Sequence, residues 1–247
     1  MLNVLICGIN GKMGEAVYNS CKAQGINVVC GIDKYLKLGY DCPCYKSFDE
    51  VKEDVDTVID FSHPSALPKI IDFACASGAK IVSGTTGYGQ KEMELIRKFS
   101  RKIGFFYSEN MSVGLHAFIE GCVDTFKCLK APQIDIIEKH HFSKADVPSG
   151  TALLIGRALT GAAKEKYKLV TFNGKRLSKN DIVIHSLRSG SAVGEHTVVF
   201  SLDGDAITMT HRAESRSIFS DGAIEAARFI LSKNHGLFSF KDMLLSR

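Results

Sequence analysis

The chain has 247 residues, 45% of them apolar, and a formal charge of +4 at pH 7. This composition indicates a globular protein with a core large enough for one large domain or two smaller ones. The charge is small for the length and no run of Lys and Arg stands out, so we expect no nucleic-acid partner and a small anionic ligand instead.

The sequence contains no run of about 18 apolar residues. The N-terminal MLNVLICGING also lacks the basic region of a secretory signal, so we expect a soluble, cytoplasmic protein without a membrane partner. Several of the 8 cysteines lie within apolar runs, which predicts reduced thiols packed in a core. Cys42 and Cys44 form a close pair, but no second pair or histidine lies at zinc spacing, so no metal site is predicted.

The N-terminal segment reads as strand, glycine turn, helix and strand, with apolar runs over 2–7 and 26–32 around the turn GINGKMG. Glycines in such a turn let backbone N–H groups approach a pyrophosphate at the helix N-terminus. Asp33 ends the second run 19 residues after Gly14, where a carboxylate can bind an adenosine ribose. The alternative is a purely structural βαβ turn. The residues assigned to the cofactor here are Gly8, Gly11, Lys12, Met13, Gly14, Asp33 and Lys34.

Two further apolar runs, 56–61 and 80–83, alternate with a helical pattern over 68–77. This alternation predicts a Rossmann-type, doubly wound parallel sheet, whose ligands bind beyond the carboxyl ends of the strands. The segments SHP and GTTG follow two of those ends, and the hydroxyls and N–H groups of GTTG suit a carboxamide or carboxylate. His63 has two interpretations, a residue that stacks near the cofactor or, more simply, a solvated loop residue. The cofactor contacts assigned here are Phe61, Ser62, Gly84, Thr85 and Thr86.

After a fifth apolar run over 104–108 the alternation stops. Strand-like runs follow at 134–137, 170–172, 182–187, 196–202 and 206–211, and Asp203-Gly204 is a hairpin signal between the last two. They predict a second α+β domain with an open mixed, largely antiparallel sheet. A helical pattern over 222–233 returns to the first domain. We therefore expect a dinucleotide-binding domain over 1–109, completed by 217–247, and a second domain over 110–216.

The segment HHFSKADVPSGTA, residues 140–152, gathers two imidazoles, an ammonium, a carboxylate and hydroxyls in a short stretch. Ser149 and the apolar pattern after it predict a helix start, whose unpaired N–H groups favour an anion. With the histidines and Lys144 nearby, the segment is suited to hold a carboxylate and to move a proton. The alternative is a loop whose histidines only hydrogen-bond to the backbone.

Residues 138–151 read E-x-H-H-x-x-K-x-D-x-P-S-G-T, which resembles the central motif of the 4-hydroxy-tetrahydrodipicolinate reductase (dihydrodipicolinate reductase) family. Further segments occur in the family's order along the whole chain: GINGKMG, IDFSHP, SGTTG, ENMSVG, RSGSAVGEH and THRAESR. Glu15 departs from the pattern, since many members carry Arg there. This departure removes a positive charge near the cofactor and argues against a strong preference for NADPH.

The resemblance implies that 110–216 binds substrate and forms a homotetramer. It also implies hydride transfer from NADH or NADPH to a cyclic dicarboxylate, 4-hydroxy-tetrahydrodipicolinate, and protonation of the neighbouring carbon, in the diaminopimelate route to lysine. His140 is then the proton donor and Lys144 the second catalytic group. The implied substrate contacts are His141, Lys144, Ser149, Gly150, Thr151 and, conditionally, Arg216. Thr85, Thr86 and Gly87 are implied near the nicotinamide and Asn110 near the hinge.

Two alternatives compete with this interpretation. One is another two-domain NAD(P)-dependent dehydrogenase acting on an amino or keto acid, which would not need the HH-x-x-K-x-D-x-PSGT segment. The other is a dinucleotide sensor without turnover, which would not need the His and Lys cluster. A sensor acting on DNA should also show a helix-turn-helix or a basic face, and the sequence indicates neither.

Overall fold

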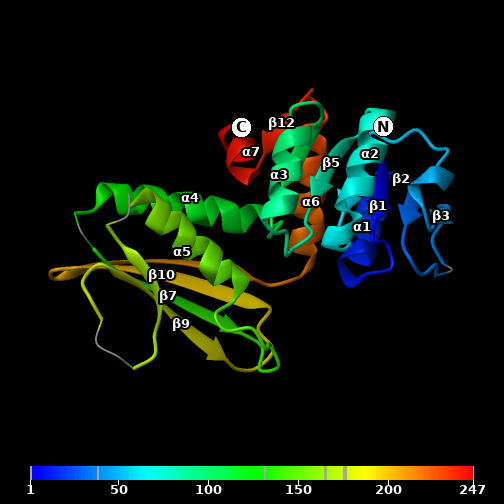
Figure 1. The fold of residues 1–247 in the computed structure, drawn as a ribbon. Coiled ribbons are helices and arrows are strands. Elements are labelled where there is room, and N and C mark those ends of the chain that lie inside the picture. Colours follow the sequence, from blue (N-terminus) through cyan, green and yellow to red (C-terminus); the bar gives the residue numbers. More distant parts are fainter. Residues whose placement is uncertain (1, 38, 131, 164–165, 175–176, 247) are drawn as a thin grey trace. The chain divides into compact units, whose positions relative to one another are not determined.

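The computed structural model describes residues 2–37, 39–130, 132–163, 166–174 and 177–246. The chain divides into two compact units (Figure 1), the first formed by Met1–Val113 with Ser217–Arg247 and the second by Gly114–Arg216. The first boundary between the two units therefore falls at residue 113, four residues beyond the expected 109. The reason is that the loop after the strand ending at Tyr107 still packs in the first unit. Met111 is 1% exposed within that unit's core.

The first unit contains a seven-stranded sheet in the order β12-β6-β5-β4-β1-β2-β3, with every neighbouring pair parallel. Its strands are β1 Asn3–Cys7, β2 Asn27–Ile32, β3 Cys44–Tyr45, β4 Thr57–Asp60, β5 Lys80–Ser83, β6 Gly104–Tyr107 and β12 Gly236–Phe238. The chain leaves β1 for β2 in one direction and reaches β4, β5 and β6 in the other. The predicted doubly wound sheet is confirmed, and its order reverses between β1 and β4, where such folds bind their ligands.

Helices cover both faces of this sheet. The described helices are α1 Lys12–Ala23, α6 Ser217–Ile230 and α7 Phe240–Leu245 on one face and α2 Leu67–Ser77 and α3 Gln90–Phe99 on the other, with 3₁₀ turns at Phe48–Glu50 and Pro64–Ala66. Alternate residues of β1 enter the two cores: Val4 and Ile6 pack with α1 and α6, whereas Leu5 packs with α2. Burial of both faces explains why the strands read as unbroken apolar runs.

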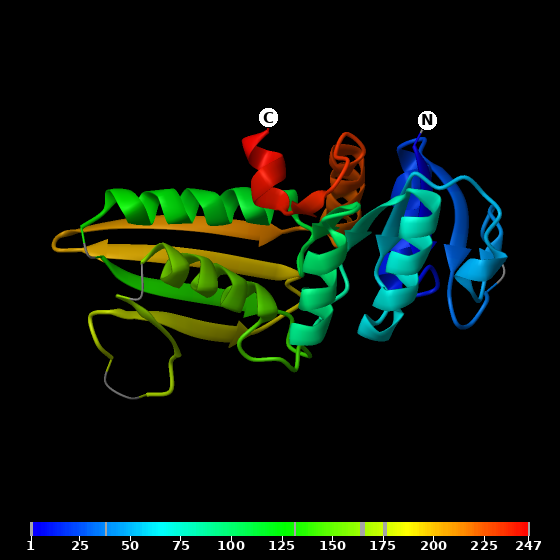
Figure 2. The same ribbon diagram turned by 45° about the horizontal axis from the view of Figure 1, so that its top comes forward.

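The second unit contains a five-stranded sheet in the order β11-β10-β7-β9-β8. Its strands are β7 Gln133–His140, β8 Lys168–Thr171, β9 Asp181–Arg188, β10 Gly194–Leu202 and β11 Asp205–Ala213. Helices α4, Val113–Cys128, and α5, Gly150–Ala162, cover one face of this sheet (Figures 1 and 2). Ile134 and Ile136 are fully buried on that face.

The second sheet is mixed, as predicted. β10 pairs antiparallel with β7 and β11, whereas β9 pairs parallel with β7 and β8. Parallel strands need a crossover connection, and the chain from β7 to β8 runs through α5. The Asp203-Gly204 hairpin is confirmed, since Leu202 pairs with Asp205 and Gly204 has φ +80°.

All 8 cysteines are free thiols. Cys7, Cys21, Cys30 and Cys122 are buried as predicted, whereas Cys75 and Cys128 are exposed. Among the described residues, none of the helices has the length and apolar character that crossing a membrane requires.

Gly222 of α6 gives a test of the first unit's packing. A Cβ at this position would lie 1.8 Å from the backbone oxygen of Met111, which cannot move like a flexible side chain. We expect Gly222→Ala to lower the free energy of unfolding by about 1–3 kcal/mol, the usual cost of overpacking. The control is Gly161→Ala in α5, where a Cβ meets nothing within 4 Å. That variant should gain up to about 1 kcal/mol. Urea unfolding followed by circular dichroism measures both, and equal midpoints would contradict the expected clash.

Candidate active site

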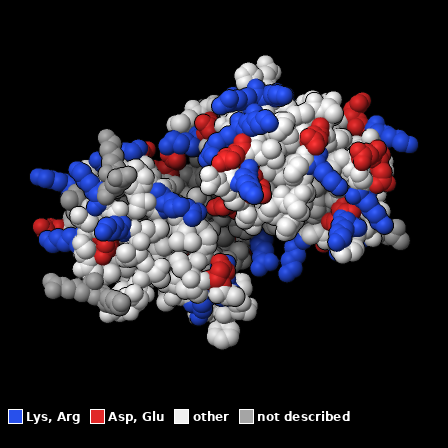
Figure 3. All heavy atoms as spheres, in the orientation of Figure 1, with Lys and Arg blue, Asp and Glu red and all other residues white. Residues whose placement is uncertain are grey.

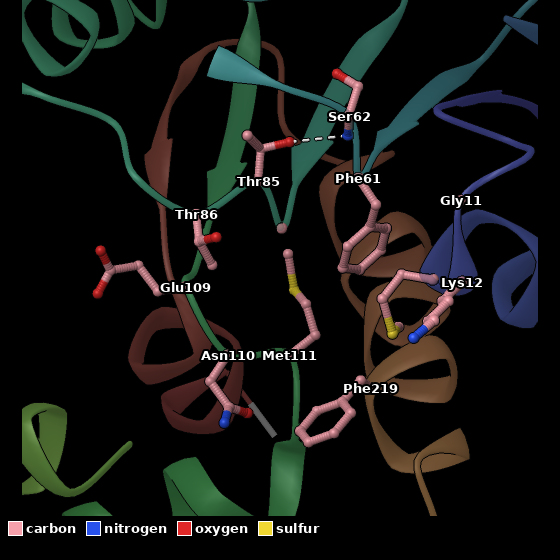
Figure 4. Close-up of a pocket in the computed structure, with 12 residues that line it drawn as sticks. Gly11, Lys12, Phe61, Ser62, Thr85, Thr86, Glu109, Asn110, Met111 and Phe219 are labelled. Carbon is pink, nitrogen blue, oxygen red and sulfur yellow. Dashed lines mark hydrogen bonds between the residues drawn. The ribbon is translucent and has the colours of Figure 1, made fainter. Parts of the chain in front are cut away.

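A cavity of about 510 Å³ lies within the first unit at the carboxyl ends of its strands (Figure 4). Lys12, Phe61 and Phe219 lie across this space from Thr86 and Asn110. The lining residues are Gly11, Lys12, Met13, Phe61, Ser62, Gly84, Thr85, Thr86, Glu109, Asn110, Met111 and Phe219. The structure thus brings the glycine turn, the end of β4 and the GTTG loop to one cavity.

The glycine turn is shaped by close backbone contacts. A Cβ at Gly14 would lie 2.1 Å from the oxygen of Gly8, and Gly8 itself has φ +81°. α1 begins directly after Gly11, and Gly11 offers no side chain to cap its first N–H groups. Because glycines carry no side chains, a dinucleotide pyrophosphate could approach the backbone of this turn closely. The N–H groups at the N-terminus of α1 would favour its negative charge.

A second cavity of about 640 Å³ in the same unit adjoins the turn and contains both Asp33 and Lys34. The carboxylate of Asp33 accepts hydrogen bonds from the backbone N–H groups of Asn10 at 3.0 Å and Tyr35 at 3.2 Å. The exposed lysines Lys46 and Lys69 also line this cavity, and the sequence interpretation did not include them. The residues present fit the adenosine half of the cofactor.

The GTTG loop is held in place by hydrogen bonds to Asp60, which is fully buried at the end of β4. Its carboxylate accepts hydrogen bonds from the hydroxyls of Ser83 at 2.8 Å, Thr85 at 2.9 Å and Tyr88 at 3.1 Å. The hydroxyl of Thr85 also accepts the backbone N–H of Ser62 at 3.0 Å (Figure 4). Thr85 therefore organises the loop with its side chain, whereas Thr86 is exposed at the cavity.

In the second unit, α5 begins as predicted after Ser149. The hydroxyl of Ser149 accepts the N–H of Ala152 at 3.1 Å, a side-chain N-cap. Ser149 is only 2% exposed, and its hydroxyl also lies 3.3 Å from Nε2 of His196. The hydroxyl of Ser149 therefore makes its hydrogen bonds within the protein. Gly150, the next residue, is exposed at the helix start.

His140 ends β7 with its ring 7% exposed, and its Nδ1 is hydrogen-bonded to Oε2 of Glu138. Glu138 is fully buried, and Nη2 of Arg188 lies 2.9 Å from its Oε1. Burial alone would raise the pKa of Glu138, but the hydrogen bonds from His140 and Arg188 lower that pKa to about 2. The histidine is therefore held by an ionised carboxylate, and the predicted alternative of histidines bonded only to backbone is wrong for His140.

The loop between β7 and α5 carries the other titratable side chains. Lys144 Nζ pairs with Oδ1 of Asp146 at 2.7 Å, and this hydrogen bond holds the pKa of Asp146 below its usual range. His141 Nδ1 lies 3.0 Å from the hydroxyl of Ser143. Arg216 is exposed at the end of the second unit, just before α6.

Three residues that the sequence interpretation did not assign complete this cluster: Glu138, Arg188 and His196. They come from β7, β9 and β10, and parallel and antiparallel pairing aligns His140 with Arg188 and Glu138 with His196. All three lie within the motifs quoted above, Arg188 and His196 at the two ends of RSGSAVGEH, but a motif does not show which side chains meet.

Glu138, His140 and His196 offer ligand atoms within 4.8 Å of one another, a spacing that a metal ion could use. The carboxylate, however, already pairs with the permanent cation of Arg188. A divalent ion would have to approach this guanidinium closely, so the donor set does not fit a metal, and we assign the cluster to proton chemistry.

Burial first, and then the nearby charge of His140, lowers the pKa of His196 to about 3. An unfolded histidine takes up its proton near pH 6.5, so the neutral His196 stabilises the fold above that pH. This stability is lost as the pH falls from about 6.5 towards 3, by about 1.4 kcal/mol per pH unit. We expect His196→Gln to flatten the pH dependence of the free energy of unfolding. Replacing the exposed His63 with Gln serves as the control, and parallel curves for wild type and His196→Gln would contradict the prediction.

Curated relatives match over the full length. The chain is 38% identical to the 4-hydroxy-tetrahydrodipicolinate reductase of Caldanaerobacter subterraneus subsp. tengcongensis, with 99% of this chain and 98% of the relative covered. It is 36% identical to the enzyme of the same name from Clostridium novyi, with both chains fully covered. The fold resembles a dipicolinate-bound dihydrodipicolinate reductase from Paenisporosarcina sp. TG-14, with a TM-score of 0.82, 19% identity and 97% of each chain covered.

Two family models also match. The model described as dihydrodipicolinate reductase, N-terminus, matches residues 2–111, and the model of the C-terminus of the same enzyme matches residues 114–244. Together they span nearly the whole sequence, and their junction lies next to the division between the two units. The chain therefore belongs to the dihydrodipicolinate reductase family.

Proposed function

We propose that this protein is the NAD(P)H-dependent 4-hydroxy-tetrahydrodipicolinate reductase of the diaminopimelate route to lysine. The observation that carries the proposal is the side chain of His140, held by a buried carboxylate in the same unit as an anion-binding helix start. Relatives of that name match the full chain.

In the first unit, the turn from Gly8 to Gly14 would hold the pyrophosphate through backbone N–H groups and the N-terminus of α1. Asp33 and Lys34 would contact the adenosine ribose, and Thr86 and Asn110 would face the nicotinamide. When bound, NADH or NADPH supplies the hydride. Phe61, Met111 and Phe219 add apolar walls to this cavity.

In the second unit, the first N–H groups of α5, at Gly150 and Thr151, would bind one carboxylate of the substrate. The ammonium of Lys144 and the imidazole of His141 would bind the other carboxylate or the charge that develops in the ring. His140 would then donate a proton to the carbon next to the one that accepts the hydride. In this assignment Ser149 acts through its helix cap rather than by direct contact, and Arg216 remains a conditional anion partner.

The second unit also supports the proposal of a homotetramer. The face of its sheet opposite α4 and α5 carries Ile137, Leu187 and Val199, and Leu187 is 50% exposed. Threonines extend this face, with the hydroxyls of Thr197 and Thr210 3.0 Å apart. A flat surface of this kind suits a second copy of the chain. Sedimentation of the purified protein tests the assembly, and the family's role in biosynthesis favours the cytoplasm as its location.

The two alternatives are less well supported. A cofactor sensor needs no buried Glu138–His140 pair. On the face in Figure 3, described Lys and Arg side chains are interspersed with Asp and Glu, so this face lacks the broad basic surface that DNA binding requires. The deciding assay is loss of NADH absorbance with the freshly made condensation product of pyruvate and aspartate semialdehyde. Turnover with simple amino or keto acids, but not with this product, would overturn the proposal.

We predict that His140→Gln lowers kcat by about 10²- to 10⁴-fold, the usual contribution of a positioned general acid. The KM for the substrate should change much less, because the anion-binding groups belong to α5 and Lys144. Steady-state kinetics across pH measure both values. The control is His235→Gln, since His235 is exposed in the first unit and lines neither cavity. Wild-type kcat in His140→Gln would remove the proton-donor assignment.

The cofactor cavity predicts use of both NADH and NADPH, with NADH equal or somewhat better. Asp33 favours a ribose diol and repels a 2′-phosphate, while Lys34 attracts that phosphate. Exposed charge pairs contribute only about 0.2–1 kcal/mol each, so the ratio of kcat/KM should lie within about tenfold. Asp33→Asn should shift the ratio towards NADPH and Lys34→Ala towards NADH. Lys98→Ala, on α3 outside the cavity, is the control. A native preference for NADPH above about a hundredfold would show that Asp33 does not act on the ribose.

A further inference from the structure

Glu138 lies at the centre of the polar cluster of the second unit, yet it contributes no atom to its surface. It is 0% exposed and sits two residues before His140 on the helix-covered side of β7. One carboxylate oxygen, Oε2, is bonded to Nδ1 of His140. The other, Oε1, accepts Nη2 of Arg188 at 2.9 Å and the backbone N–H of Ser149 at 3.2 Å.

We infer that Glu138 is a positioning residue for the proposed reaction: its Oε2 orients His140 for proton donation, and its Oε1 fixes the start of α5, where the substrate carboxylate binds. The inference rests on the proposed function of His140. It extends that function by joining the proton donor and the anion site through one buried carboxylate.

The first step of the argument concerns the ring of His140. When Nδ1 donates to Glu138, Nε2 is the nitrogen left to carry the transferable proton. A Cβ at Gly194 would lie only 3.1 Å from this Nε2, so the glycine keeps the nitrogen uncovered. The ring of His196 packs edge-on against the ring of His140, with the two centroids 5.2 Å apart. Glu138 and Gly194 thus present one defined nitrogen of His140.

The second step concerns charge. The groups around His140 are Glu138 on its own strand, Arg188 on β9, His196 on β10 and Lys144 in the following loop. Arg188 keeps Glu138 ionised, and the carboxylate in turn stabilises a protonated His140. Buried His196 stays neutral, so it does not compete for this negative charge. The negative charge of Glu138 therefore contacts Arg188 and His140.

The third step concerns the helix start. Arg188 Nε also donates to the carbonyl oxygen of Lys144 at 3.3 Å, and Nη2 donates to that of Asp146. Together with the Ser149 N–H bond to Glu138, these contacts fix both ends of the loop 144–149. Removing only the charge of Glu138 should therefore affect proton donation, whereas removing its oxygens should also affect anion binding.

The experiment compares Glu138→Gln, which keeps the shape and an oxygen, with Glu138→Ala. Glu94→Gln is the control, since Glu94 is exposed on α3 of the first unit and lines neither cavity. In Glu138→Gln we expect kcat to fall on the order of 10- to 100-fold, as for loss of a charge-assisted hydrogen bond. The alkaline limb of the kcat/KM profile should move to lower pH by about one unit. Binding of dipicolinate, measured by calorimetry, should change by less than about threefold.

Glu138→Ala should in addition weaken dipicolinate binding by about tenfold or more, because Ser149 loses its partner. Circular dichroism confirms that each variant is folded, and the near-isosteric Gln variant decides the question if the Ala variant does not fold. Wild-type kcat and an unshifted pH profile in Glu138→Gln would overturn the inference.

A readout without turnover separates this inference from the proposed function. In ¹⁵N-histidine spectra, the resonance lost in His140→Gln identifies His140, and its protonation should occur at lower pH in Glu138→Gln than in wild type. If the wild type fails to reduce the substrate but this shift is seen, the proposed function is wrong and the Glu138–His140 coupling stands. If the shift is absent, the coupling is wrong whatever the activity.

Discussion

The arrangement of the second unit depends on a carboxylate that has been removed from water. An ionised Glu138 inside the protein would be very unfavourable without partners, and its two oxygens bring together His140, Arg188 and Ser149 from β7, β9 and the start of α5. One buried charge is therefore stabilised by groups from two paired strands and from the start of a helix. The same contacts orient the imidazole of His140.

The first unit uses a buried carboxylate with a different set of donors. Asp60 accepts hydroxyls of Ser83, Thr85 and Tyr88, and in this way it holds the loop that follows β5 against the end of β4. In both units a buried acid at or near a strand end organises a neighbouring loop through hydrogen bonds. Each loop can then present backbone N–H groups in fixed positions, which binding an anion or a carboxamide requires.

Charge also separates the roles of the two buried histidines. His140 faces an ionised carboxylate, whereas the pKa of His196 is lowered to about 3 by burial and by the neighbouring imidazole. Two similar side chains 5.2 Å apart thus have different surroundings, because the hydrogen bond to Glu138 belongs to His140. The neutral His196 can bond the cap hydroxyl of Ser149 without adding a second positive charge.

The amino-acid sequence alone determined the parallel sheet, the glycine turn, the helix after Ser149 and the hairpin at Gly204, because each depends on local pattern and turn chemistry. It did not predict β3, β12 or α7, which have two, three and six residues and are too short to show a period. It also missed α3, although the ten residues of that helix are amphipathic. Only the tertiary structure decided that Arg188 and His196 meet Glu138, because long-range register, not spacing along the chain, places these side chains together.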